Sequence, residues 1–194
     1  ILILVTFVFQ AVSYEFQSKA GNLLGKRTFR IFLTLNGCLA PLLIGTAVGT
    51  FFTGSDFTVN KSAVGNIASP VISRWGNEWH GLEAVANPFN VEFGLMVTML
   101  AVSLGALYLI NNVDSDKLAQ QLRRSLMVCF GLFLILFVVV CYNLITMEGF
   151  AVDASGEVFM QKGKYFANLV EMPAVLALLL SGAVLLVVGV VVTL

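Results

Sequence analysis

PFNVEFGLMVTMLAVSLGALYLIN, residues 88–111, is the stretch that decides the fold. Its 24 residues include a single charged side chain, Glu92, and an α-helix needs about 20 mostly apolar residues to cross the hydrocarbon core of a bilayer. Three more apolar segments of similar length lie at residues 29–52, 125–147 and 168–194. None shows the alternation of a β-barrel strand, so we predict four transmembrane helices.

The composition agrees with this prediction. Of the 194 residues, 58% are hydrophobic and only 11% are charged, whereas about a quarter of the residues in a soluble domain are charged. The sequence therefore predicts an all-α protein, a polytopic bundle of transmembrane helices. The formal net charge is zero, and no dense run of Lys and Arg is present, so binding of nucleic acid is not indicated.

The two ends predict that the chain is a fragment of a longer protein. It opens with ILILVTFVFQ, residues 1–10, an apolar run too short to span a membrane. It closes inside the last apolar segment without a polar tail. We therefore expect one transmembrane helical domain over residues 1–194, incomplete at both ends, with four full spans and one truncated span.

The distribution of Lys and Arg predicts the orientation. The connections at 14–28 and 112–124, with the adjoining Arg30, carry seven positive side chains, against four in the connections at 53–87 and 148–167. Under the positive-inside rule the first pair of connections lies in the cytoplasm. The long polar loop at 53–87 then faces outward.

Cysteine and histidine are too few and too scattered for a metal centre. Cys38, Cys129 and Cys141 lie far apart inside apolar runs, and His80 is the single histidine. We interpret the cysteines as small buried apolar residues and expect no metal site in this chain. Sequence motifs for a serine nucleophile, a dinucleotide or a phosphate-binding loop are also missing.

The stretch RWGNEWHGLEAVANPFN, residues 74–90, holds the most reactive side chains of the outward loop. Two interpretations remain open. In the first, Trp75 and Trp79 share one side of a short amphipathic helix at the membrane surface. In the second, Glu78, His80 or Glu83 carries protons or contacts a partner.

Two acids lie within the predicted spans. Glu92 is about one turn into the second full span and Glu171 about one turn into the last, both near the outer surface. They are either interfacial anchors, which the membrane boundary tolerates, or carboxylates of a proton path or ligand site. Pro41 and Pro173 are expected to kink their helices.

Five segments, in order, resemble subunit II of cytochrome bd-type quinol oxidases. FVFQAVSYEFQSK (7–19) is similar to the end of the third helix of that family and its cytoplasmic loop. NGCLAPLLIGTAVGTFFTGSDF (36–57) is similar to the fourth helix, and NPFNVEFGLM (87–96) to the start of the fifth. GALYLINN (105–112) resembles the end of the fifth helix and NLVEMPAVL (168–176) the start of the seventh.

The resemblance implies a subunit of a terminal respiratory oxidase in the bacterial cytoplasmic membrane, a complex that oxidises quinol and reduces O2. It implies that haems b and d belong to the partner, the haem-bearing subunit I, and that this chain binds no cofactor by itself and is not catalytic alone. Its expected roles are assembly and access of protons and oxygen to subunit I. Membrane lipid and a quinone are further expected partners.

One departure from the family pattern concerns the first connection. Gln10 and Gln17 stand where the family usually has arginine, so a charge role cannot be carried over to either position. Glu15 and Lys19 match the acid and the lysine of that loop, and the resemblance implies that they form ion pairs at the cytoplasmic face. The alternative function is a secondary transporter or channel with kinked helices, which Glu92 and Glu171 at membrane depth would favour.

Overall fold

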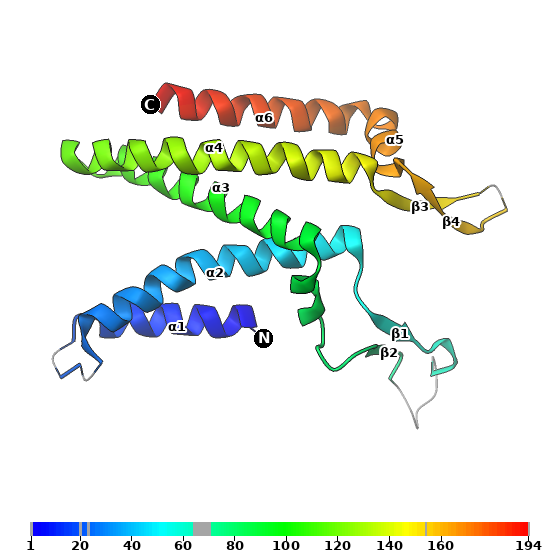
Figure 1. Cartoon of the computed structure of the whole chain (residues 1–194), viewed down its shortest axis with the longest axis horizontal. Helices are drawn as coiled ribbons and strands as arrows, with labels where there is room; N and C mark the ends of the chain where they lie inside the picture. Colours follow the sequence, from blue (N-terminus) through cyan, green and yellow to red (C-terminus); the bar gives the residue numbers. More distant parts are fainter. Residues whose placement is uncertain (1, 20, 23, 64–70, 154, 194) are drawn as a thin grey trace. The chain divides into compact units, whose positions relative to one another are not determined.

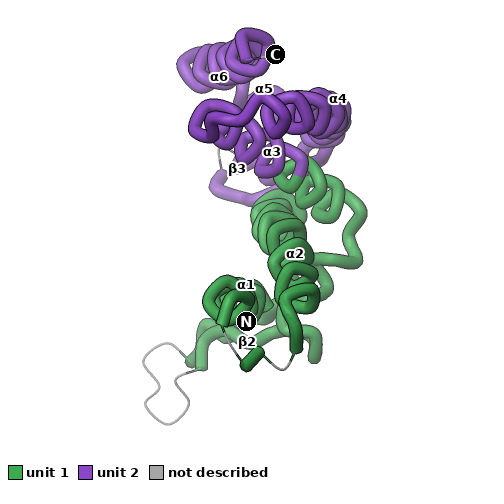
Figure 2. The backbone as a smooth tube through the Cα atoms, turned by 90° about the vertical axis from the view of Figure 1, so that its left-hand side faces the viewer, with its two compact units in different colours: residues 1–98 green, residues 99–194 purple. Residues whose placement is uncertain are grey.

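The protein is described by a computed structural model. It describes residues 2–19, 21–22, 24–63, 71–153 and 155–193. Their contacts form two compact units, Ile1–Thr98 and Met99–Leu194 (Figure 2). The expectation of a single transmembrane domain stays a prediction.

In its described residues, the first unit contains two α-helices, a β-hairpin, two short 3-10 helices and the start of a third α-helix (Figure 1). In chain order they are α1 (Leu2–Phe16), α2 (Gly25–Thr53), β1 (Phe57–Val59), the 3-10 helix η1 (Lys61–Ala63), β2 (Ser73–Trp75), the 3-10 helix η2 (Leu82–Ala86) and α3 (Pro88–Asn112). Helix α3 continues into the second unit, which adds α4 (Asp116–Thr146), β3 (Glu148–Val152), β4 (Val158–Lys162), α5 (Lys164–Glu171) and α6 (Pro173–Thr193).

The prediction of four full spans is confirmed for the part of the chain that the structure describes. Among the described residues, α2, α3, α4 and α6 are long and apolar enough to cross a membrane, while α1 is a shorter apolar helix. The α3 helix begins at Pro88, as predicted, and ends one residue beyond the predicted boundary. The all-α fold is therefore correct, with two short hairpins in the connections as additions that the sequence did not predict.

The connection predicted at residues 112–124 is mostly helical, and this boundary was wrong. Helix α4 begins at Asp116, and the extended Ser115 accepts the Ala119 amide through its carbonyl at 2.9 Å. Residues 116–124, DKLAQQLRR, are mostly good helix formers, and an acid in the first turn favours the helix dipole. The change to polar residues therefore marks the end of the membrane-crossing part and not the end of the helix.

The last predicted span, 168–194, is two helices. Helix α5 ends at Glu171 and α6 begins at Pro173. A residue before proline is disfavoured in the α conformation, and Met172 indeed leaves it, with φ −116° and ψ 74°. Pro173 thus starts a helix instead of kinking one, whereas Pro41 lies inside the continuous α2.

The connection after α4 is an antiparallel hairpin. Strands β3 and β4 pair from Glu148 opposite Lys162 to Val152 opposite Val158. The left-handed Gly163 (φ 65°) then turns the chain into the amphipathic α5, which contacts α4, β3 and α6. A short amphipathic helix therefore exists in this protein, but it lies at 164–171 and not in the predicted stretch 74–90.

Helices α2 and α3 cross closely through glycines in the first unit. A Cβ on Gly45 would lie 2.7 Å from the Gly94 Cα, and a Cβ on Gly94 would lie 2.6 Å from the Leu42 carbonyl oxygen. These distances are far below ordinary carbon contacts. Small residues let transmembrane backbones approach in this way, and the crossing fixes where the outer ends of the two helices meet.

Candidate functional site

A polar hollow of about 250 Å³ lies where the predicted outer ends of α2 and α3 meet. Every lining residue belongs to the first unit. The lining combines two carboxylates, two amides, two hydroxyls and small residues: Thr53, Gly54, Ser55, Asp56, Glu83, Ala84, Asn87 and Asn90. We call this hollow the outer pocket.

Asn90 joins three elements at the base of the outer pocket. Its side chain is 1% exposed. The Oδ1 atom accepts a hydrogen bond from the Thr53 hydroxyl at 2.9 Å, and the Nδ2 atom donates to the Ala84 carbonyl at 3.1 Å. Gly49 makes room for it, because a Cβ there would lie 2.7 Å from Oδ1. Asn90 therefore ties α2, η2 and α3 together.

Asn87 starts α3 at the rim of the outer pocket. Its Oδ1 accepts the Phe89 amide at 3.0 Å, which is the bond of an N-capping asparagine. Pro88 follows at the first helical position, where its missing N–H costs nothing. The Asn-Pro pair thus places Asn90 less than one turn into the helix.

Glu83 is the predicted site residue that the structure places in the outer pocket. Its Oε2 accepts the Gly81 amide at 2.9 Å. Its Oε1 is buried and has no hydrogen-bond partner among the described residues. Gly81 adopts a left-handed φ of 93°, which glycine tolerates, and this turn allows the short bond to Glu83.

Asp56 supplies the second carboxylate of the outer pocket. Its backbone carbonyl accepts the Gly76 amide at 2.9 Å, and its Oδ2 accepts the Asn77 amide group at 3.2 Å. Gly76 has to be glycine for this arrangement, because a Cβ would overlap the Asp56 carboxylate. The β1–β2 hairpin therefore anchors Asp56 beside η2.

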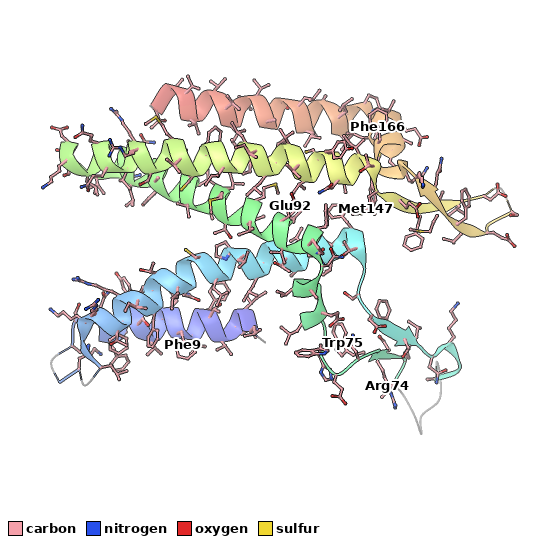
Figure 3. All side chains as sticks on the ribbon, in the orientation of Figure 1. Phe9, Arg74, Trp75, Glu92, Met147 and Phe166 are labelled. Carbon is pink, nitrogen blue, oxygen red and sulfur yellow. The ribbon has the colours of Figure 1, made fainter. Side chains whose placement is uncertain are left out.

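The remaining candidates of residues 74–90 do not enter the outer pocket. Trp75 ends strand β2 opposite Phe57, so the predicted amphipathic helix carrying both tryptophans was wrong. Figure 3 shows Trp75 and Arg74 on this hairpin. The backbone of His80 is left-handed, with a φ of 50°, and does not fit a right-handed α-helix. The centroid of its exposed ring lies 6.5 Å from that of the Trp75 ring, in an edge-on arrangement. Glu78 is exposed in the same turn.

The two predicted intramembrane acids lie in different settings. Glu92 is on α3, about one turn from its start, and is partly buried (Figure 3). Glu171 is the exposed last residue of α5. Its predicted position inside a span was wrong, because the break at Met172 leaves it outside α6. The structure brings neither acid to the outer pocket.

At the other end of the first unit, Glu15 and Lys19 form an ion pair. The Lys19 Nζ lies 2.6 Å from a Glu15 oxygen, one helical turn apart. The hydrogen bond from Lys19, with its positive charge, lowers the pKa of the Glu15 carboxyl below its ordinary value. Both side chains are more than half exposed, so solvent screens most of this attraction.

Two buried asparagines, Asn36 and Asn90, were not among the predicted site residues. Asn36 donates from Nδ2 to Gln10 Oε1 at 2.7 Å, across α1 and α2. It is 4% exposed, and its Oδ1 has no partner among the described residues. Asn36 and Asn90 are both asparagines inside apolar helices, and that signal could have identified them.

The outer pocket has the chemistry of a water-holding cleft. A water occupies about 30 Å³ in the liquid and needs two to four polar partners, and the pocket supplies carboxylates, amides and hydroxyls around its volume. Within the described part of the chain, no three His, Cys, Asp or Glu side chains are grouped to hold a metal ion.

The fold defines the class as a polytopic helical membrane protein with four long apolar helices. The family model for cytochrome bd terminal oxidase subunit II matches residues 1–194. The chain therefore belongs to the cytochrome bd terminal oxidase subunit II family. A search of curated proteins gave no significant match. The family assignment favours the oxidase subunit over the transporter or channel.

Proposed function

We propose that this chain packs against a haem-bearing subunit I in a quinol:O2 oxidoreductase, supports assembly of the complex, and helps protons and oxygen reach that partner. The observation that carries the proposal is the family match over the whole chain. In this scheme haems b and d belong to the partner, and the complex uses a quinol.

The surface of the long helices supports a partner role. In α6, large apolar side chains are exposed along most of the helix, among them Leu178, Leu185 and Val192 at 69–81% exposure, while Val190 is buried. Such a helix needs lipid or other apolar helices around it. Partner helices and lipid together would cover α6.

The position of His80 supports placing the haems in the partner. Haem iron is held by an axial side chain such as His or Met. His80, the single histidine of the sequence, projects from an exposed turn outside the predicted spans and contacts the Trp75 ring. This setting does not fit a histidine axial ligand within a helical bundle.

Co-expression tests the partner role. The gene for subunit I is expressed together with the full-length gene for this subunit and, in parallel, alone. The reduced haem spectrum of the membranes is recorded in both cases. We expect the haem signal and the quinol-dependent oxygen consumption to fall together when this subunit is absent. An intact and active oxidase without it would refute the proposal.

Within this function, the outer pocket is our candidate for water and proton access at the outer face. Glu83 carries the argument because its Oε1 is buried without a partner while Oε2 is held by Gly81. Oε1, unpaired in the described part of the chain, is the atom of the pocket lining that we assign to proton transfer. Asp56 and Asn87 would hold that water.

The charge-neutral variant Glu83→Gln tests this role, with Glu78→Gln as the matched control in the exposed turn. We expect Glu83→Gln to slow oxygen consumption several-fold while haem content stays constant, and Glu78→Gln to leave the rate unchanged. His80→Ala and Glu78→Ala extend the same comparison. Equal rates for Glu83→Gln and the control would leave Glu83 only its structural bond to Gly81.

A further inference from the structure

The polar first turns of α4 carry a second hollow, of about 570 Å³, unrelated to the outer pocket. Its lining residues are Gln120, Gln121, Arg123, Arg124 and Met127. Four of them, at positions 120, 123, 124 and 127, follow the spacing of one helical face. We call all five lining residues the α4 basic face.

The two arginines of the α4 basic face have no anionic partner within the chain. Both side chains are exposed, and in the described ranges neither guanidinium makes an ion pair or a hydrogen bond. Asp116 lies about two turns earlier on the helix and is not paired with them either. Two adjacent arginines therefore line the hollow without an anionic partner in the described ranges, and their guanidinium donors are available to an external anion.

This face of α4 points away from the packed side of the helix. Leu126, Phe130 and Phe133 are buried and mark the packed side. At 3.6 residues per turn, the centre of the α4 basic face is about 120° around the helix from Leu126. The hollow therefore lies away from the buried side of α4.

The same side of α4 becomes apolar where the helix enters the membrane. Below Met127, which is 55% exposed, come Gly131, where a Cβ would contact nothing, and the exposed Ile135 and Val138. The missing side chain of Gly131 leaves a gap in this row of side chains, about two turns after the arginines. The two arginines therefore lie at the predicted membrane surface, next to an exposed apolar strip of the same helix.

We propose that the α4 basic face binds the phosphate of an anionic phospholipid, with Arg123 and Arg124 on the phosphate oxygens, the glutamines on the headgroup, and an acyl chain along Gly131. Guanidinium groups match phosphate geometry with paired hydrogen bonds. The positive-inside distribution places this end of α4 at the cytoplasmic surface, where anionic lipids attract basic residues. The apolar strip selects a lipid over a free phosphate.

The test uses the full-length protein purified with the subunits that accompany it, delipidated in detergent. Thermal unfolding is followed while phosphatidylglycerol, phosphatidylcholine or inorganic phosphate is added. We expect phosphatidylglycerol to stabilise the protein at a concentration at least about tenfold lower than either of the others, because charge-assisted hydrogen bonds are among the strongest polar contacts.

The double variant Arg123→Gln/Arg124→Gln should raise the half-saturating concentration of phosphatidylglycerol by about tenfold or more. The matched control, Lys26→Gln/Arg27→Gln, removes the same charge on the same predicted side outside the hollow and should leave it within about twofold. A Gly131→Leu variant, which fills the apolar gap, should weaken phosphatidylglycerol without changing the response to inorganic phosphate.

Three results would overturn the proposal. Equal loss in both double variants would reduce the effect to general surface charge. Inorganic phosphate as effective as phosphatidylglycerol would assign the site to a free anion. Dissociation of the accompanying subunits from Arg123→Gln/Arg124→Gln, with no lipid preference in the parent protein, would assign the arginines to an acidic protein partner.

Discussion

Replacing Gly45 by alanine should separate α2 from α3 and destabilise the protein. The new Cβ would lie 2.7 Å from the Gly94 Cα and 2.9 Å from the Val97 Cβ. Ordinary carbon contacts begin at about 3.5 Å, so the helices must part by roughly 0.8 Å. The nearest atom belongs to the backbone, so a rotamer change cannot relieve the overlap.

The magnitude follows from two opposing effects. Overpacking of this kind costs about 1–3 kcal/mol, while alanine is better than glycine in a helix by up to about 1 kcal/mol. We therefore expect Gly45→Ala to lower the free energy of unfolding by about 1–2 kcal/mol. Gly37→Ala lies on the same helix with nothing within 4 Å of its Cβ and should be neutral or slightly stabilising.

The assay is unfolding of the full-length protein in mixed micelles by titration with a denaturing detergent. Gly94→Ala should behave like Gly45→Ala, because its Cβ would lie 2.6 Å from the Leu42 carbonyl oxygen. The double variant should cost less than the sum of the single variants, since both act on one crossing. Identical midpoints for Gly45→Ala and Gly37→Ala would refute the close crossing.

Other consequences of the structure can be measured separately. Asn90→Leu removes two buried hydrogen bonds and should lower the free energy of unfolding by about 2–4 kcal/mol. The control Asn112→Leu, on the exposed end of α3, should lower it by under about 1 kcal/mol. Similar unfolding midpoints for the two variants would contradict the role of Asn90. Lys19→Gln should let the pKa of the Glu15 carboxyl rise toward its ordinary value. The titration is followed through the carboxylate infrared band of Glu15, which is identified by its loss in Glu15→Gln. Because folding lowers this pKa, the contribution of the ion pair to folding stability is present at pH values above the unfolded pKa and is lost as pH falls through the folded pKa. An unchanged titration of Glu15 in Lys19→Gln would exclude the ion pair in solution.

The sequence alone determined the membrane class and the number of full spans, because long apolar segments leave few alternatives in a bilayer. It also placed the start of α3, since Asn87-Pro88 is a local capping signal. The boundary at Asp116 and the break at Met172 were predicted wrongly. At the first, polar residues that are good helix formers continue the helix beyond the apolar segment, and at the second the backbone restriction before proline ends it.

Only the tertiary structure decided the candidate site. The outward loop contains three ionisable candidates, Glu78, His80 and Glu83, and no sequence pattern distinguishes one of them as the site residue. The left-handed turn at His80 and Gly81 sends Glu83 inward while the other two stay exposed. Asp56 joins Glu83 through pairing of the β1–β2 hairpin, and Asn90 joins both through the glycine crossing of α2 and α3. These contacts depend on residues far apart in the chain, so local sequence patterns could not predict them.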